Sequence, residues 1–416
     1  MGCYQWSGWG ILPVALKPAE LASTLSQQPW QHWTEDLSDN EIKDIRRFYT
    51  RSSANVFRPL KDGRYSLDIA ATDMGHIKTT IEGVEVVLSK IQLITLDEIA
   101  ICYLHMVTEK EIAKTCVSKV NRGAFQWQPR TQYHQVTQWC DQHGNEACLT
   151  EWMSDLLHTV IDGDKSYGED AFGHELASCS WVRRTEKDGD EGICVSELSA
   201  GIKLNDPGYV LAQQEYQRLY SNQFSVWKDW RCQYNRGRLV FVEDSCECST
   251  LQANLSQFSY YLDLFAMVIY QKIMLTYFKD ELVLGEESTR NLLYTRIASF
   301  RRKYKVSHMS TYPFAEELYQ YLHRQAGIEK LEEKAFIELE HSYALWKKES
   351  EDINSRVIYF ISLIAALLVP TSSVATIFAL NEKQMSLGFW IASSLLTGVT
   401  FVVILWPLVR KLLRKK

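Results

Sequence analysis

The sequence predicts an α+β protein with a mixed α/β cytoplasmic domain, a long helical stalk and a C-terminal hairpin of two transmembrane helices. The hairpin is indicated by two segments, residues 357–380 and 384–409, that contain no charged side chain. A helix of 24 residues rises about 36 Å, enough to cross a hydrocarbon core of about 30 Å. Before the hairpin, β-branched runs within residues 1–250 give way to helical periodicity in residues 251–356.

The first 250 residues carry both strand and helix patterns. A capping residue followed by helically spaced apolar residues predicts a helix at 39–52, and further helices are expected at 109–118 and 148–161. Residues 162–200 are rich in Gly, Asp and Lys and are expected to be loop with at most one strand pair. Alternating or β-branched runs predict strands at 65–69, 84–88, 91–96, 98–104 and 238–242.

The apolar stretch from Phe258 to Phe278 is long enough to resemble a third membrane span. Asp263, near its start, and the polar pair Gln271 and Lys272 interrupt it. A charge within the membrane costs several kcal/mol. A buried helix of the soluble part is therefore favoured over a span.

The last soluble helix meets no breaker before the membrane. Pro313 is expected to open the helix that precedes it, and Gly327 to close that helix. No further Pro or Gly occurs before Pro370, so one helix of more than 40 residues should run from Ile328 into the segment 357–380. A helix that enters the membrane directly can transmit force, which points to gating.

Basic residues set the orientation of the hairpin. The tail at 410–416 carries five positive charges and no acid, whereas the loop at 381–383 holds one Lys and one Glu. Because Lys and Arg near span ends stay in the cytoplasm, the tail and residues 1–356 are predicted to be inside and the loop outside. All ten cysteines lie in residues 1–356, which suits a reducing compartment. The expected location is the plasma or inner membrane.

Composition and motifs argue against several function classes. The net charge is −6, and the part before the basic tail is more acidic still, so no nucleic-acid partner is expected. The N-terminus has neither the basic region nor the apolar core of a secretory signal. The pair His174 and Glu175 lacks the second His of a zincin. Since no Walker loop, nucleophile elbow or dinucleotide turn occurs either, the protein is not expected to be an enzyme.

The best candidate metal site in the soluble part combines two histidines with two cysteines: His134, Cys140, His143 and Cys148. Their spacing of six, three and five residues could close a tetrahedral zinc site. The set lacks a CxxC knuckle, however. The alternative is that these are ordinary surface histidines and buried cysteines.

The end of the first predicted span carries the most specific motif. Pro370 is followed two places later by Ser372, and the span ends Phe-Ala-Leu-Asn at 378–381. This pattern resembles the CorA family of divalent-cation channels, whose first span has a proline, a small polar residue two places later and an aromatic-Gly-Met-Asn ending. Ala379 and Leu380 depart from the family's Gly and Met. The long stalk, short outer loop, second span and basic tail also match the family.

The resemblance implies a homopentamer in the lipid bilayer that passes a hydrated divalent cation such as Mg²⁺, gated by the cytoplasmic domain and without any other cofactor. The outer mouth and its selectivity would then depend on Phe378, Ala379, Leu380, Asn381 and Glu382. The implied pore-lining residues are Ser355, Ile358, Ile361, Ala365, Val369, Ser372 and Thr376. In the family, intracellular metal bound by carboxylates between subunits closes the pore. Acidic residues that could serve here are Asp162, Asp164, Asp280, Glu281, Glu286 and Glu287.

Alternatives remain for each part of this hypothesis. The pore-facing stripe could instead be a packing surface of small residues. Asn381 could be a helix-terminal residue in left-handed geometry, and Ala379 could move its amide out of register. The alternative function is a ligand-gated membrane effector, with a cytosolic regulatory ligand, that depolarises or permeabilises the membrane.

Overall fold

The computed structural model divides the chain into two compact units, Met1–Phe336 (unit 1) and Ile337–Lys416 (unit 2). The residues that it describes are 3–16, 25, 29–33, 38–53, 63–96, 99–126, 137–157, 161–166, 176–185, 194–201, 212–244, 250–284, 290–380, 391, 394–395 and 398. In the last long helix, the side chains beyond residue 362 lie outside the described ones.

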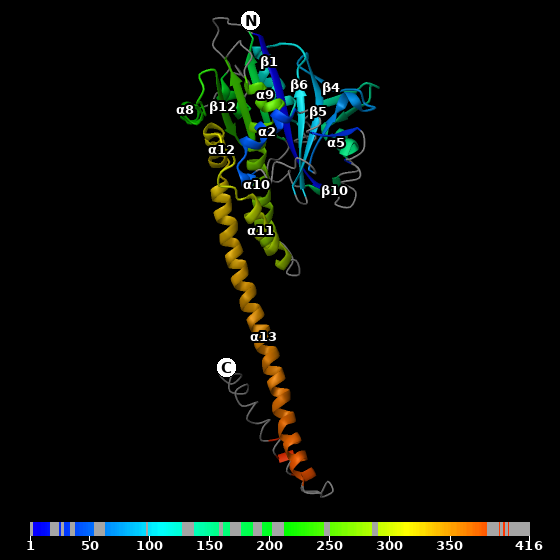
Figure 1. The fold of residues 1–416 in the computed structure, drawn as a ribbon, viewed down its shortest axis with the longest axis vertical. Helices are drawn as coiled ribbons and strands as arrows, with labels where there is room; N and C mark the ends of the chain where they lie inside the picture. The colour runs from blue at the N-terminus through cyan, green and yellow to red at the C-terminus, as the bar shows by residue number, and fades with distance from the viewer. Residues whose placement is uncertain are drawn as a thin grey trace. The chain divides into compact units, whose positions relative to one another are not determined.

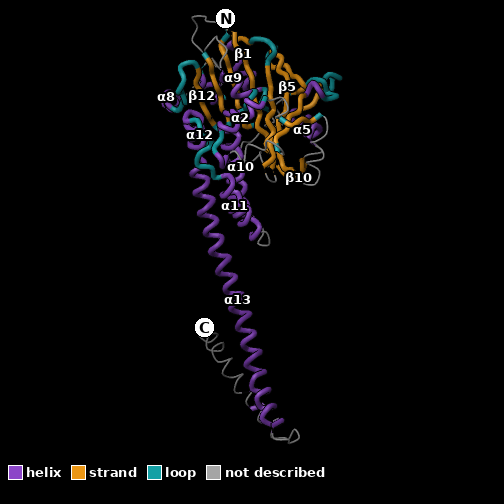
Figure 2. Tube along the Cα trace, viewed as in Figure 1, coloured by secondary structure: helices purple, strands orange, loops and turns teal. Residues whose placement is uncertain are grey.

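Unit 1 is built on one large mixed sheet of 13 strands (Figures 1 and 2). The main path of hydrogen-bonded neighbours runs β12-β13-β11-β1-β6-β5-β4-β8-β9. Among the described pairs, β11 and β13 are parallel and the others antiparallel. The strands are Cys3–Leu16 (β1), Trp30–His32 (β2), Arg64–Asp68 (β3), Ile77–Ile81 (β4), Val84–Leu96 (β5), Ile99–Val107 (β6), Ile112–Ala113 (β7), Gln138–Asp141 (β8), Glu146–Cys148 (β9), Ile161–Ser166 (β10), Ala177–Arg184 (β11), Trp230–Asn235 (β12) and Arg238–Glu243 (β13).

Strand β1 lies in the middle of this sheet, although the sequence patterns do not reveal it. It pairs with β6 on one side and β11 on the other, and Trp6 and Trp9 are buried in it. Gly8 is required by close packing, because a Cβ there would lie 2.5 Å from the ring of Phe125. The glycines and Pro13 within the strand hide its β pattern, since both residue types are unusual in a central strand.

Several predicted elements are confirmed with shifted ends. Strands β3, β5, β6 and β13 overlap the predicted ones, and α2 (Asp39–Phe48) begins directly after its N-cap Ser38, which forms a capping box with Glu41 of the helix. Residues 109–118 instead hold β7 and the start of α4 (Lys114–Gly123), while α5 (Leu149–Leu157) ends early. The stretch 162–200 has more regular structure than predicted, because it contains β11 and the helix α7 (Val195–Ala200).

The long helix α10 is the core of the helical part of unit 1. It packs against β11 and against two neighbouring helices, α11 and α12, and every side chain from Leu262 to Ile269 is buried. The stretch that resembles a third span is therefore a buried helix of unit 1, as predicted. The helices not yet given are the 3₁₀ helix η1 (Ile69–Ala71), α8 (Gln213–Ser221), α9 (Thr250–Ser256), α10 (Tyr260–Leu284), α11 (Arg290–Tyr304), α12 (Pro313–Gln325) and α13 (Ile328–Leu380).

Helix α13 is continuous over 53 residues and continues past Pro370, which confirms the prediction of one long helix. The boundary between the two units falls within it, after Phe336. Among the residues that the structure describes, no helix is found that combines the length and the apolar character needed to span a membrane.

Candidate functional site

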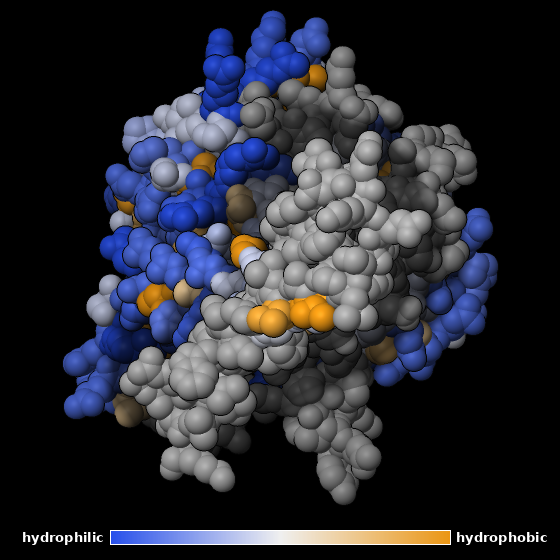
Figure 3. Space-filling model, turned by 90° about the horizontal axis from the view of Figure 1, so that it is seen from below, coloured by the Kyte–Doolittle hydropathy of each residue, from blue (hydrophilic) through white to orange (hydrophobic). Residues whose placement is uncertain are grey.

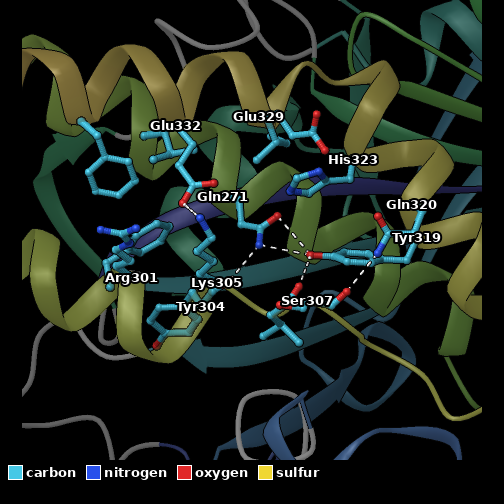
Figure 4. A pocket seen from close by; sticks show the side chains of 15 residues that line it. Gln271, Arg301, Tyr304, Lys305, Ser307, Tyr319, Gln320, His323, Glu329 and Glu332 are labelled. Carbon is cyan, nitrogen blue, oxygen red and sulfur yellow. Dashed lines mark hydrogen bonds and ion pairs between the residues drawn. The ribbon is translucent and has the colours of Figure 1, made fainter.

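A cavity of about 300 Å³ lies in unit 1 beside the start of α13 (Figure 4). Four consecutive helices, α10 to α13, contribute to its lining. Gln271 comes from α10, Tyr304 from α11, Tyr319 and His323 from α12, and Glu332 from α13. The cavity therefore lies between the buried helices of unit 1 and the first turns of α13, the helix that continues into unit 2.

Local sequence signals place α13 next to this cavity. Pro313 begins α12, as predicted, at a position where its missing N–H costs no hydrogen bond. Gly327 follows the end of that helix with φ of 70°, a left-handed conformation that favours glycine. Helix α13 starts directly afterwards at Ile328, which is buried. The short turn thus fixes the first turns of α13 along the cavity wall.

The inner end of the cavity is a network of uncharged polar groups. The Gln271 Nε2 donates to the Tyr304 carbonyl oxygen at 2.8 Å and to the Tyr319 hydroxyl at 3.2 Å. The Tyr319 hydroxyl in turn lies 3.4 Å from the Val306 carbonyl oxygen. Burial raises the pKa of Tyr319 to about 12, so this hydroxyl stays protonated and neutral at physiological pH.

Two contacts across the outer part of the cavity connect α13 with the end of α11. The Arg301 guanidinium carbon lies 4.4 Å from the centre of the Phe336 ring, and the Lys305 Nζ lies 2.6 Å from the Glu332 Oε1. Each element presents its two residues at a spacing of four, which puts them on one face. Figure 4 shows the charged ends of Lys305 and Glu332 meeting there.

His323 adds a neutral ring to the same cavity. Burial lowers its pKa and Lys305 lowers it further, although Glu329 and Glu332 act in the opposite direction. The imidazole is therefore uncharged at neutral pH. Its ring centre lies 5.7 Å from that of Tyr319. With a polar inner end, aromatic walls and a salt bridge at the outer part, the cavity is suited to reversible binding of a small molecule.

A second polar cluster is fully buried and attaches α10 to the sheet. Arg64 of β3 donates to Asp263 of α10 at 2.8 Å and to Gln92 of β5 at 3.2 Å. The hydroxyls of Tyr49 and Tyr103 also donate to the Asp263 carboxylate, that of Tyr103 at 3.0 Å. Burial, reinforced by the Asp263 charge, raises the pKa of both tyrosines well above the usual value, so both remain donors. Asp263, the acid within the apolar stretch from Phe258 to Phe278, thus has a structural role in the core and need not bind a ligand.

The predicted zinc ligands are placed only in part. His134 lies outside the described residues. The Cys140 Sγ donates to the neighbouring Asp141 carbonyl oxygen at 3.4 Å, and the His143 Nε2 lies 3.1 Å from the Asp73 carbonyl oxygen. In the part of the chain that the structure describes, no group of three or more His, Cys, Asp or Glu side chains is arranged to hold a metal ion.

The predicted pore residues lie at and beyond the limit of the described side chains. Ser355, Ile358 and Ile361 are exposed on α13. Asn381 and Glu382 lie outside the described residues. Seven others lie on the described backbone of α13, with side chains outside the described ones: Ala365, Val369, Ser372, Thr376, Phe378, Ala379 and Leu380.

The predicted regulatory carboxylates are not gathered into one site among the described residues. Asp162 and Asp164 lie on β10, and Asp280 and Glu281 lie near the end of α10. The remaining pair, at 286–287, lies outside the described residues.

None of the candidate site residues predicted from the sequence is among the described residues that line the cavity or form its charged contacts. The available signals were the basic last turn of α11, with Arg301 in it, and the four-residue spacing of Glu332 and Phe336. Neither shows which helix faces which. Comparisons of the chain with protein-family models, curated proteins and solved structures gave no match.

Proposed function

We propose that the chain is one subunit of an oligomeric membrane channel of the CorA type, in which residues 357–380 of α13 line a pore for divalent cations, Mg²⁺ in particular. The observation that carries the proposal is a run of five exposed apolar residues in α13. Their exposed fractions are 51% for Val357, 63% for Ile358, 43% for Tyr359, 63% for Phe360 and 60% for Ile361.

Five successive residues cover the full circumference of a helix, because each is turned by about 100° from the last. A helix that is apolar on all sides requires an apolar environment. The uncharged sequence continues from this run to Leu380, which is long enough for a bilayer. In the view of Figure 3, the described residues are largely hydrophilic, with hydrophobic ones scattered among them. These features favour lipid and neighbouring subunits as the surroundings of this part of α13.

The same helix offers the side chains that a gated pore needs. Ser355, Ile358 and Ile361 recur every three residues and so lie within an arc of about 120° around α13. A ring of isoleucines from several subunits would block ions by excluding water from the constriction. Two membrane helices from one chain cannot enclose an aqueous path, so several chains must contribute; the resemblance to CorA implies five.

A second candidate, a ligand-gated membrane effector, is favoured by the cavity at the start of α13. A small molecule bound there would contact the helix that continues into 357–380. In this version the pore opens in response to the ligand and depolarises or permeabilises the membrane, and its ion selectivity is secondary.

The oligomeric state tests both versions, because each needs a shared pore. The full-length chain is purified in detergent and its mass is measured by native mass spectrometry. A mass of five chains is expected. The mass is also measured for two variants. Ile361→Asp places a charge in the proposed constriction, and Lys347→Asp, on the exposed part of the same helix, is its control. A parent protein that is monomeric under all detergent conditions contradicts the proposal.

A further inference from the structure

We propose that the cavity between α11, α12 and the start of α13 binds a small aromatic anion, whose negative group takes Arg301 and Lys305 away from their partners on α13. Binding is expected whatever the chain does in a membrane. The consequence for gating rests on the proposed function, since it assumes that movement of α13 opens a pore.

The size and walls of the cavity suit one aromatic ring with a charged substituent. Its volume of about 300 Å³ is at the lower end for small-molecule sites. Phe300, Tyr304 and Phe336 contribute aromatic surface, on which a ring can pack edge-to-face or with an offset stack. At the inner end, the amide of Gln271 and the hydroxyl of Tyr319 offer hydrogen bonds.

The outer part holds two cations that can bind an anion, Arg301 and Lys305, beside the carboxylates of Glu329 and Glu332. Arg301 and Lys305 are one helical turn apart and both line the cavity, so the oxygens of a single phosphate or carboxylate can contact both. Hydrogen bonds between a charged donor and a charged acceptor are stronger than neutral ones. His323 is neutral at physiological pH because burial lowers its pKa, so it presents a polar ring rather than a third cation.

The present partners of both cations are easily replaced. Lys305 is 49% exposed and Glu332 is 18% exposed, so water reaches the lysine end of the pair and weakens it. Arg301 is exposed, and its cation–π contact with Phe336 is therefore also weak. The anion therefore competes with weak contacts rather than strong ones.

The two partners that the ligand displaces, Glu332 and Phe336, both belong to α13. Ligand binding can therefore change how this helix is held. Glu332 and Phe336 lie one turn apart on its first turns. A ligand that replaces both contacts binds better to the state in which α13 is released, and such a difference in affinity is what shifts a conformational equilibrium.

The test is isothermal titration calorimetry on the full-length chain in detergent with three probes. Phenyl phosphate carries both the ring and the charge, inorganic phosphate only the charge, and benzyl alcohol only the ring. Phenyl phosphate is expected to bind at least about tenfold more tightly than either of the other two, because it uses both parts of the site. Absence of phenyl phosphate binding at millimolar concentration overturns the inference.

Variants locate the binding to this cavity. Arg301→Gln should weaken phenyl phosphate binding about tenfold, whereas its exposed neighbour Arg302, which is not among the described lining residues, should tolerate Arg302→Gln without effect. Glu332→Gln should strengthen binding several-fold, because it removes the carboxylate that competes for Lys305. This gain has the opposite sign from any loss caused by misfolding. Equal affinities for Arg301→Gln and Arg302→Gln, or weaker binding by Glu332→Gln, would contradict the proposal.

Discussion

Two ion pairs of unit 1 have nearly the same length but different surroundings. Arg64 and Asp263 are 2.8 Å apart with side chains 1% and 0% exposed, whereas Lys305 and Glu332 are 2.6 Å apart with side chains 49% and 18% exposed. Judged by distance alone, the two ion pairs would be equally strong. Water is excluded from the pair of Arg64 and Asp263, which is therefore a fixed attachment. Water screens the pair of Lys305 and Glu332, which is therefore a contact that a ligand can replace.

The difference also concerns what each pair connects. The buried pair attaches α10 to the sheet, and the hydroxyls of Tyr49 and Tyr103 complete the shell of Asp263. The exposed pair attaches α13 to the end of α11. The pair of Arg64 and Asp263 therefore lies inside the core. The weaker pair of Lys305 and Glu332 lies at α13, the helix that the proposed mechanism requires to move.

The largest effect is expected from breaking the buried pair. Arg64→Met should lower the free energy of unfolding by about 3–5 kcal/mol, because it leaves the Asp263 charge buried without its counter-ion. Urea denaturation followed by tryptophan fluorescence measures this. The control is Arg47→Met, which removes an arginine from a pair whose side chains are 74% and 62% exposed. If both variants lose less than about 1 kcal/mol, the contrast between the two environments is wrong. The double variant Arg64→Met with Asp263→Leu should recover part of the loss.

A partly buried ionisable group beside a like charge sharpens the comparison. His105 stacks on Trp9 and contacts the hydroxyls of Ser7 and Ser89. Burial, assisted by the positive charge of Lys90, lowers its pKa to about 4. The folded state therefore favours the neutral ring.

Its contribution to stability is complete above the unfolded pKa of about 6.5 and is lost as the pH falls towards 4, by about 3 kcal/mol. Unfolding free energies measured between pH 7 and pH 4 should show this decline, and His105→Gln should reduce its slope. An unchanged slope in the variant would assign the decline to other groups.

Removing one donor from the buried pair tests how far its stability depends on the surrounding shell. Tyr103→Phe deletes the hydroxyl that lies 3.0 Å from the Asp263 Oδ1. The expected loss is about 1–3 kcal/mol, because the carboxylate oxygen is left short of a partner in the core. Tyr312→Phe, at a ring that is 49% exposed, serves as the matched control in the same denaturation assay and should change little. A loss no larger than that of the control would mean that Arg64 and Tyr49 satisfy Asp263 without Tyr103.

The smallest effect is expected at the exposed pair. Lys305→Met should lower the free energy of unfolding by about 0–1 kcal/mol, and the difference from the parent should shrink as salt is added. The parent and the variant are compared at low and at high salt concentration. A loss of several kcal/mol that salt does not reduce would show that this pair is not the replaceable contact described above.

The sequence predicted elements whose pattern is local and missed those that depend on distant partners. Strand β5 and the long helix α13 follow directly from β-branched residues and from the absence of breakers. Strand β1 does not, because its place in the sheet depends on β6 and β11, and Gly8 is there to accommodate the ring of Phe125. The charge of Asp263 within the apolar stretch predicts a buried helix rather than a third span, yet its partner Arg64 lies 199 residues away in the sequence, and no spacing rule connects them.

The candidate site was harder to predict than the fold, for a physical reason. Lys305 lies directly after α11 and Glu332 lies on α13, and the turn at Gly327 and the packing of α12 bring them together. Each residue on its own is typical of a solvated helix surface. The resemblance at 378–381, in contrast, concerns adjacent residues and could be recognised without any structure.

The channel proposal is tested most directly by ion flux through proteoliposomes that contain the full-length chain, with gradients of Mg²⁺, Zn²⁺, Co²⁺ and Na⁺. The expected result is Mg²⁺ flux that Asn381→Ala abolishes or makes unselective. Asn381→Gly, which keeps left-handed geometry but lacks the amide, should behave like Asn381→Ala if the amide binds the hydrated ion. Flux that appears only with phenyl phosphate would favour the ligand-gated effector. If no ion passes with or without that ligand, the central claim of a pore is wrong.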